Sequence, residues 1–207
     1  MRIMHRRGLT LVLLAFAAVP LLAAQAGSPS QYAVLLASLK AGKTDIDYAR
    51  LRLSYMDSPE YKQAKDTTDA EKAMAKALNA KDYPTALTQA ETVLASNYVN
   101  IDAHFVAYVA NREMGATDRA QFHHTVFLGL IDSIRSSGDG KSPATAWVVI
   151  SVDEEYAVLQ VLGFTSSGQS LLQQNGHSYD VMKAKNDAGT EQTFFFNVDI
   201  PFQHYGF

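Results

Sequence analysis

Five residues have side chains that could take part in catalysis, and all of them lie in the second half of the chain: His104, His123, Lys141, Glu155 and His177. Histidine and glutamate exchange protons in acid–base catalysis, and both can bind zinc. If folding gathers all five in one pocket, they would form the site of a hydrolase or of a metal-dependent enzyme. The interpretation that we favour is a structural one, in which the histidines are partly buried and hydrogen-bonded to backbone or carboxylate groups.

The two histidines at positions 104 and 123 are expected to lie on facing helices. Their spacing predicts an offset of about 7–8 Å along the helix axis, so that a shared water or metal rather than direct contact would join them. A zinc ion would need a third ligand, which Glu154, Glu155 or His177 could supply. The H-E-x-x-H motif of metalloproteases is absent from the sequence. We therefore predict no metal ion and no other cofactor.

A glycine-rich loop supplies four candidate ligand-binding residues: Gly138, Asp139, Gly140 and Lys141. A nucleotide-binding loop would need a glycine where this chain has Arg135, and it would follow a strand rather than a helix. The exposed amides of residues 138–140 could instead form an anion-binding nest beside the lysine. This alternative predicts a small-anion-binding protein, whereas the simpler interpretation is a helix end followed by a tight turn.

The acidic segment Asp153-Glu154-Glu155-Tyr156 contributes a further ligand-binding candidate, Tyr156. Paired carboxylates can perform acid–base catalysis. Acids are also favoured at the start of a helix, and we expect Asp153 to cap a short helix over residues 154–162. Capping is the interpretation that we favour.

Asp180 and Asn197 complete the ligand-binding candidates. The turn at Asp187-Ala188-Gly189 predicts a hairpin in which these two side chains are neighbours on paired strands. Strand alternation places both on the face opposite Phe194 and Phe196.

The first 26 residues have the pattern of a secretory signal peptide. Three arginines precede an apolar run from Leu9 to Leu22, and Ala24-Gln25-Ala26 forms the cleavage site. An uncleaved membrane anchor is the alternative. Cleavage takes the three arginines with it and lowers the net charge from −3 to −6. Such an acidic protein without cysteine is not suited to bind nucleic acid or an anionic membrane surface, and we expect a periplasmic or secreted location.

Residues 69–136 have the periodicity of two helical hairpins. Small residues recur 34 positions apart, with Ala86 and Ala120 each in the first turn of a second helix. This period resembles that of tetratricopeptide-like repeats. Two hairpins are fewer than the roughly three repeats that a self-standing solenoid needs, so another part of the chain must cover them.

The strand-rich part, residues 144–202, is expected to supply that cover. Buried or alternating patterns predict strands at residues 146–152, 170–173, 179–185 and 193–200. Residues 31–39 read as a helix, and the type of residues 45–55 is left open. The sequence thus predicts one α+β domain over residues 27–207, with a small antiparallel sheet.

Several short strings together resemble a bacterial family named domain of unknown function 4919. They are Leu51-Arg52-Leu53-Ser54-Tyr55, Ile101-Asp102-Ala103-His104, Gly138-Asp139-Gly140-Lys141-Ser142, Asp153-Glu154-Glu155-Tyr156, Ser178-Tyr179-Asp180 and Phe196-Asn197-Val198-Asp199. The resemblance spans residues 45–202 and implies a single unit in an extracytoplasmic setting. It implies no activity.

These observations favour a non-catalytic interaction or scaffold protein outside the cytoplasm. Helical hairpins present concave surfaces to peptides, so the expected partner is an envelope protein or a peptide. The hydrolase or metal-dependent enzyme and the small-anion-binding protein are the two alternatives.

Overall fold

The computed structural model describes residues 28–205, so the predicted signal peptide lies outside the described residues. Its elements in chain order are α1 Gln31–Lys40, α2 Tyr48–Tyr55, α3 Pro59–Lys62, α4 Thr68–Asn79, α5 Tyr83–Ser96, α6 Ile101–Glu113, α7 Thr117–Arg135, the 3-10 turn Pro143–Thr145, β1 Trp147–Val148, α8 Val152–Val161, β2 Phe164–Gln174, β3 His177–Asn186, β4 Glu191–Asn197 and α9 Asp199–Tyr205.

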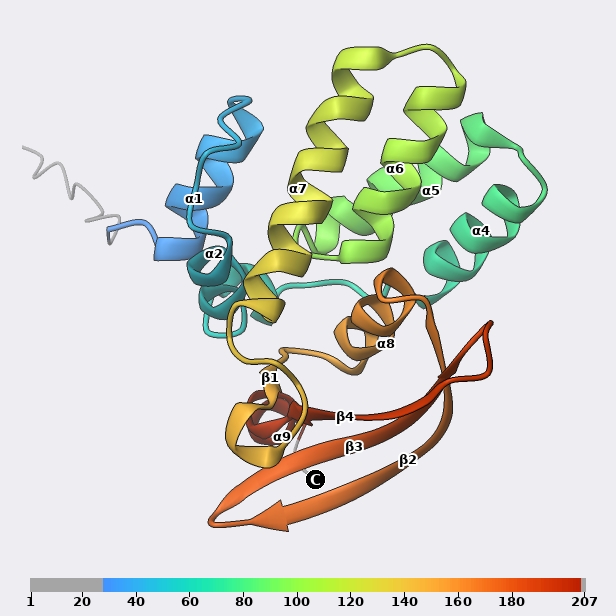
Figure 1. The fold of residues 1–207 in the computed structure, drawn as a ribbon. Coiled ribbons are helices and arrows are strands. Elements are labelled where there is room, and N and C mark those ends of the chain that lie inside the picture. Colours follow the sequence, from blue (N-terminus) through green and yellow to red (C-terminus); the bar gives the residue numbers. More distant parts are fainter. Residues whose placement is uncertain (1–27, 206–207) are drawn as a thin grey trace, which may run out of the picture.

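The predicted helical hairpins are α4 with α5 and α6 with α7 (Figure 1). Asp82 accepts a hydrogen bond from Thr85 N–H at the start of α5, and Asn100 caps α6 in the same way. Gly115 has a φ of 76° after α6, a conformation that glycine adopts without strain. Ala86 is fully buried and Ala120 is 5% exposed, as expected for small residues where helices cross.

Two helix starts differ from the sequence-based prediction, in which Asp69 and Asp153 cap their helices. The helix α4 follows Thr67, so Asp69 lies in its first turn rather than at its cap. The helix α8 follows Ser151, which places Asp153 in the first turn. Within residues 45–55, whose type the sequence left open, Tyr48–Tyr55 form α2, because the Asp47 side chain accepts from Arg50 N–H at the start of the helix.

The sheet has the strand order β1-β4-β3-β2. The strands β2, β3 and β4 are antiparallel as predicted, whereas β1 pairs with β4 in parallel, so the sheet is mixed. The strand β1 has only two residues, since the chain then turns into α8. The strands β2 and β3 are longer than predicted, and residue 200 belongs to α9 rather than to β4.

The helix α8 lies between the helical hairpins and the sheet (Figure 1). Its buried face contacts one side of the sheet, where Phe194, Phe196 and Met182 join the main hydrophobic core. The core also includes Trp147, which stacks on Phe194 with ring centroids 5.7 Å apart. This main core joins α7 to the sheet, while a second core fills the space between α4, α5 and α6, and Tyr98 packs against both. The contact with the rest of the domain explains how two hairpins can be stable without further repeats. None of the helices in residues 28–205 is long and apolar enough to span a membrane.

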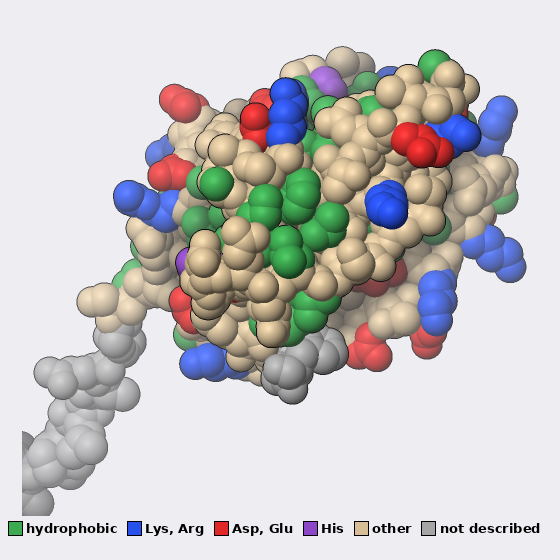
Figure 2. Space-filling model, turned by 60° about the horizontal axis from the view of Figure 1, so that its bottom comes forward, with side chains coloured by type: hydrophobic (Ala, Val, Ile, Leu, Met, Phe, Trp, Pro, Cys, Tyr) green, Lys and Arg blue, Asp and Glu red, His purple; other side chains and the backbone are tan. Residues whose placement is uncertain are grey.

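The opposite side of the sheet exposes hydrophobic side chains. Val181 pairs with Phe195 across β3 and β4, and both are half-buried. Figure 2 shows hydrophobic side chains gathered on this side of the molecule, with Lys, Arg, Asp and Glu side chains mostly around its edge.

Candidate functional site

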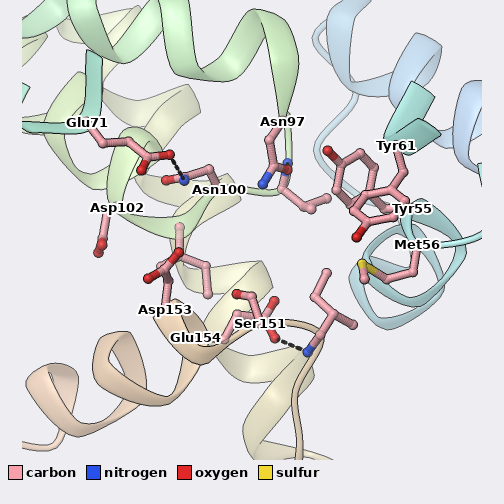
Figure 3. Close-up of a pocket in the computed structure, with 13 residues that line it drawn as sticks. Tyr55, Met56, Tyr61, Glu71, Asn97, Asn100, Asp102, Ser151, Asp153 and Glu154 are labelled. Carbon is pink, nitrogen blue, oxygen red and sulfur yellow. Dashed lines mark hydrogen bonds between the residues drawn. The ribbon is translucent and has the colours of Figure 1, made fainter. Parts of the chain in front are cut away.

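A groove lies between the helices α4 and α6 on one side and α8 on the other. Three cavities of about 110, 260 and 350 Å³ adjoin along it, and the side chain of Asp102 lines all three. We call this surface the α8 groove. Figure 3 shows the innermost of the three cavities.

Three carboxylates from three different helices meet in the α8 groove. Glu71, Asp102 and Asp153 lie in the first turns of α4, α6 and α8. Acids are favoured there because the helix N-terminus carries a partial positive charge. All three line the innermost cavity and the one beside it, so the groove is negatively charged at its centre.

The pKa of Asp102 reports this crowding of charge. Partial removal from water, together with the carboxylates of Asp153 and Glu71, raises the pKa of Asp102 to about 6.

Glu154 forms the floor of the innermost cavity. Its Oε2 accepts hydrogen bonds from Arg52 Nη1 at 2.7 Å and from Ile150 N–H at 2.8 Å. Its Oε1 is buried without a hydrogen-bond partner among the described residues. Burial raises the pKa of Glu154, and the positive charge of Arg52 opposes the rise. The buried carboxylate thus has one oxygen in an ion pair and one oxygen that is unsatisfied and almost closed off from the cavity.

The buried Arg52 guanidinium ties four elements together. Besides Glu154, it donates to Ser133 Oγ on α7 and to the Val148 carbonyl of β1, both at 3.1 Å. The side chain is only 1% exposed. This network fixes the start of α8 against α2 and α7, and it sets the position of the cavity floor.

The two ends of the α8 groove differ in polarity. In the innermost cavity, Tyr55, Met56 and Tyr61 lie opposite the acids (Figure 3). The two tyrosine rings meet edge to face with centroids 5.4 Å apart. At the other end, the lining is mostly apolar and includes Phe105 and Phe127, whose ring centroids are 5.5 Å apart.

The structure corrects the predicted relation of the two helical histidines. His104 Nδ1 and His123 Nδ1 are 3.0 Å apart and contact each other directly, and His104 Nε2 lies 3.0 Å from the Tyr98 carbonyl oxygen. The carbonyl requires a proton on Nε2, so Nδ1 of His104 accepts from His123. Burial lowers the pKa of His104 to about 3 and that of His123 to about 4. The pair is therefore neutral at physiological pH.

The other two basic candidates lie elsewhere. His177 Nδ1 is 2.6 Å from Asp199 Oδ2, at the turn end of β3, and its side chain is half exposed. Lys141 is exposed in the loop before β1. None of the five catalytic candidates lines the α8 groove. Within residues 28–205, no group of three or more histidine and acidic side chains is placed to hold a metal ion.

The glycine-rich loop lacks the free amides that an anion nest needs. The N–H groups of Asp139 and Gly140 both donate to the Thr145 carbonyl, at 3.0 and 2.8 Å. Lys141 N–H donates to the Asp139 side chain. Gly140 lies against the Trp147 ring, and its φ of 67° suits glycine. The loop is a support for β1 and β4, which corrects the small-anion interpretation.

The remaining candidates form a network under the sheet. Glu155 is fully buried next to Asp180, and burial together with that carboxylate raises the pKa of Glu155 to about 9. Neither Glu155 oxygen has a hydrogen bond of good geometry, and the Asp180 carboxyl beside it disfavours the ionised form of Glu155. The Glu155 carboxyl is therefore protonated at physiological pH. Gln169 Nε2 donates to Asp180 at 2.6 Å, and Tyr156 Oη donates to Gln169.

Asp180 and Asn197 are not cross-strand neighbours. Asp180 pairs with Phe196, and Asn197 pairs with Tyr179, so the two side chains lie on opposite faces of the sheet. Asn197 instead donates to Asp199 at 3.1 Å, beside His177. The predicted pairing was off by one residue, and a one-residue shift exchanges the faces.

Sequence reasoning missed the residues that matter most in the α8 groove. Glu71 and Asp102 received no role, although both are acids in first turns and Asp102 lies in a string that resembles the family. Arg52 also lies in such a string, and its burial was not foreseen. The usable signal was the helical spacing of Arg52 with the buried Leu51 and Tyr55, because a buried arginine requires a partner.

Comparison with known proteins identifies a family for the chain. No curated protein and no solved structure matches the chain. One family matches residues 28–206, which include all of the described residues, and it is described as a domain of unknown function. The protein belongs to this family, DUF4919.

Proposed function

We propose that the protein is a non-catalytic binding module of the cell envelope, which holds a basic segment of a partner protein or peptide in the α8 groove. The observation that carries this proposal is the convergence of Glu71, Asp102 and Asp153 in the innermost cavity and the one beside it. The signal-peptide pattern supports the location outside the cytoplasm.

The shape and the charge of the groove support the same kind of ligand. Helical hairpins present grooves to extended peptides. In this protein α8 forms the wall of the groove opposite α4 and α6. A negative centre favours lysine or arginine, and the lining at Phe105 and Phe127 favours an apolar neighbour. A segment with one basic and one apolar side chain a few residues apart would match both ends.

The hydrolase alternative is less well supported by the geometry. It needs its five ionisable groups in one cleft. In the structure His104 contacts His123, Glu155 adjoins Asp180 and His177 contacts Asp199. Four of the five groups thus have a local partner that explains their position, and Lys141 is exposed in its loop.

The test is selection from a random peptide library with the chain from residue 27 onward. We expect bound peptides to be enriched in lysine or arginine next to apolar residues. Asp102→Lys should weaken binding of a selected peptide by at least about tenfold, or about 1.4 kcal/mol. Asp187→Lys, in the exposed β3–β4 turn, makes the same change of charge away from the groove and should have no such effect. Equal affinity of the two variants would contradict the proposal.

A further inference from the structure

We propose that the innermost cavity of the α8 groove is a pocket for a primary ammonium group, such as the end of a lysine side chain. This inference deepens the proposed function and rests on it. The cavity measures about 110 Å³, well above the roughly 10–15 Å³ that one water molecule needs by the same measure.

The first reason is the unsatisfied oxygen at the floor. Glu154 is only 4% exposed, and its Oε1 has no hydrogen-bond partner among the described residues. Almost none of the Oε1 surface is open to the cavity, so an entering donor reaches it once the carboxylate turns slightly. A buried polar atom without a partner costs free energy, which that hydrogen bond would recover. The floor therefore calls for a donor rather than for an apolar group.

The second reason is the surrounding charge. The Glu154 carboxylate is balanced by Arg52, so a cation in the cavity needs further negative charge. Asp153 provides it, since its charge acts on both Glu154 and Asp102. Figure 3 shows Asp102, Asp153 and Glu71 together on one side of the cavity.

The third reason is the aromatic wall. Tyr55 and Tyr61 line the side opposite these acids (Figure 3). Aromatic faces attract ammonium groups and also pack against the methylenes that carry them. Carboxylates on one side and rings on the other are the surroundings that a lysine end requires.

The geometry of Glu154 selects ammonium over guanidinium. A guanidinium binds best when it donates to both oxygens of one carboxylate. Oε2 already accepts from Arg52 and from Ile150 N–H, so only Oε1 is available. A compact ammonium can use a single oxygen, and its remaining protons can turn toward Asp153.

The test is a titration of the chain from residue 27 onward with n-butylammonium chloride, followed by the backbone amide signals of Ser151, Asn97 and Ile101 in NMR spectra. We expect saturable shifts at these amides. n-Butanol, the neutral analogue, should leave them unmoved at equal concentration, and n-butylguanidinium should bind at least several-fold more weakly. Sodium chloride controls for ionic strength.

Two variants locate the binding without removing the buried ion pair. Asp153→Asn should weaken n-butylammonium binding by about tenfold, and Tyr61→Leu by a few-fold, whereas Asp187→Asn should bind as the wild type does. Shifts that are equal for n-butanol and n-butylammonium would overturn the ammonium pocket. So would an absence of saturable shifts, which would assign the cavity to water. If library peptides still bind in that case, the groove proposal stands and the pocket alone fails; if neither binds, both fail.

Discussion

Two adjacent glutamates on α8 point into two different regions and meet opposite conditions. Glu154 faces the helical hairpins, where Arg52 balances its charge and a cavity adjoins it. Glu155 faces the sheet, where its polar neighbour is the carboxyl group of Asp180. The comparison shows that a glutamate can be an ion-paired carboxylate at a cavity, as Glu154 is, or a protonated group in the core, as Glu155 is. The surroundings, rather than the residue, decide its chemistry.

The largest effect should come from breaking the Glu154 side. Arg52→Met leaves a buried carboxylate without its cation, and we expect the free energy of unfolding to fall by about 3–5 kcal/mol. Urea denaturation measures the change. Arg50→Met, two residues earlier on the same helix, removes an exposed ion pair with Asp47. It should lower the free energy of unfolding by less than about 1 kcal/mol. Similar losses in the two variants would contradict a special role for Arg52.

Burial of Glu155 should make the free energy of unfolding depend on pH. Its folded-state pKa of about 9 lies above the unfolded value, so its stabilising contribution is complete below about pH 4 and is lost as the pH rises toward 9. We expect the unfolding free energy to fall by a few kcal/mol between pH 5 and 9, because each unit of pKa shift corresponds to about 1.4 kcal/mol.

Glu155→Gln is the matched variant for this pH dependence. Glutamine keeps the shape of the protonated acid and does not ionise, so most of the fall between pH 5 and 9 should disappear. Urea denaturation at several pH values decides the matter. An unchanged slope would mean that Glu155 is not the group that titrates.

The smallest effect concerns the groove itself. The carboxylate of Asp153 is one cause of the raised pKa of Asp102. Asp153→Asn should therefore lower the pKa of Asp102 from about 6 part of the way to the usual value for aspartate. Carboxyl-carbon NMR titration measures it, with Asp187→Asn as the control. A pKa of Asp102 that does not move would show that the two acids do not share the groove.

The helices were readable from the sequence because their signals are local. Asn100 and Asp82 at caps, Pro84 in a first turn and Gly115 at an end act within a few residues. The sheet was harder, because β2 is exposed along most of its length and has no hydrophobic pattern. The pairing of Asp180 failed by one residue, since the register depends on how many residues the turn contains.

The candidate site was less predictable than the fold. Glu155 and Tyr156 were correctly seen as unusual, but the network that includes Gln169 depends on the β2–β3 register. The groove acids come from helix starts that lie far apart in sequence. Only the packing of α8 against the hairpins brings them together, and no local pattern encodes that packing.

The central claim is that the α8 groove is built to receive a positive charge. The most direct measurement is the pKa of Asp102 by carboxyl-carbon NMR, with and without saturating n-butylammonium. A bound cation favours the ionised carboxylate, so the account predicts that the pKa of Asp102 falls below its starting value of about 6, while that of Glu155 on the other side of α8 stays near 9. An Asp102 pKa that is unchanged at saturation, or one that moves no more than that of Glu155, would contradict it.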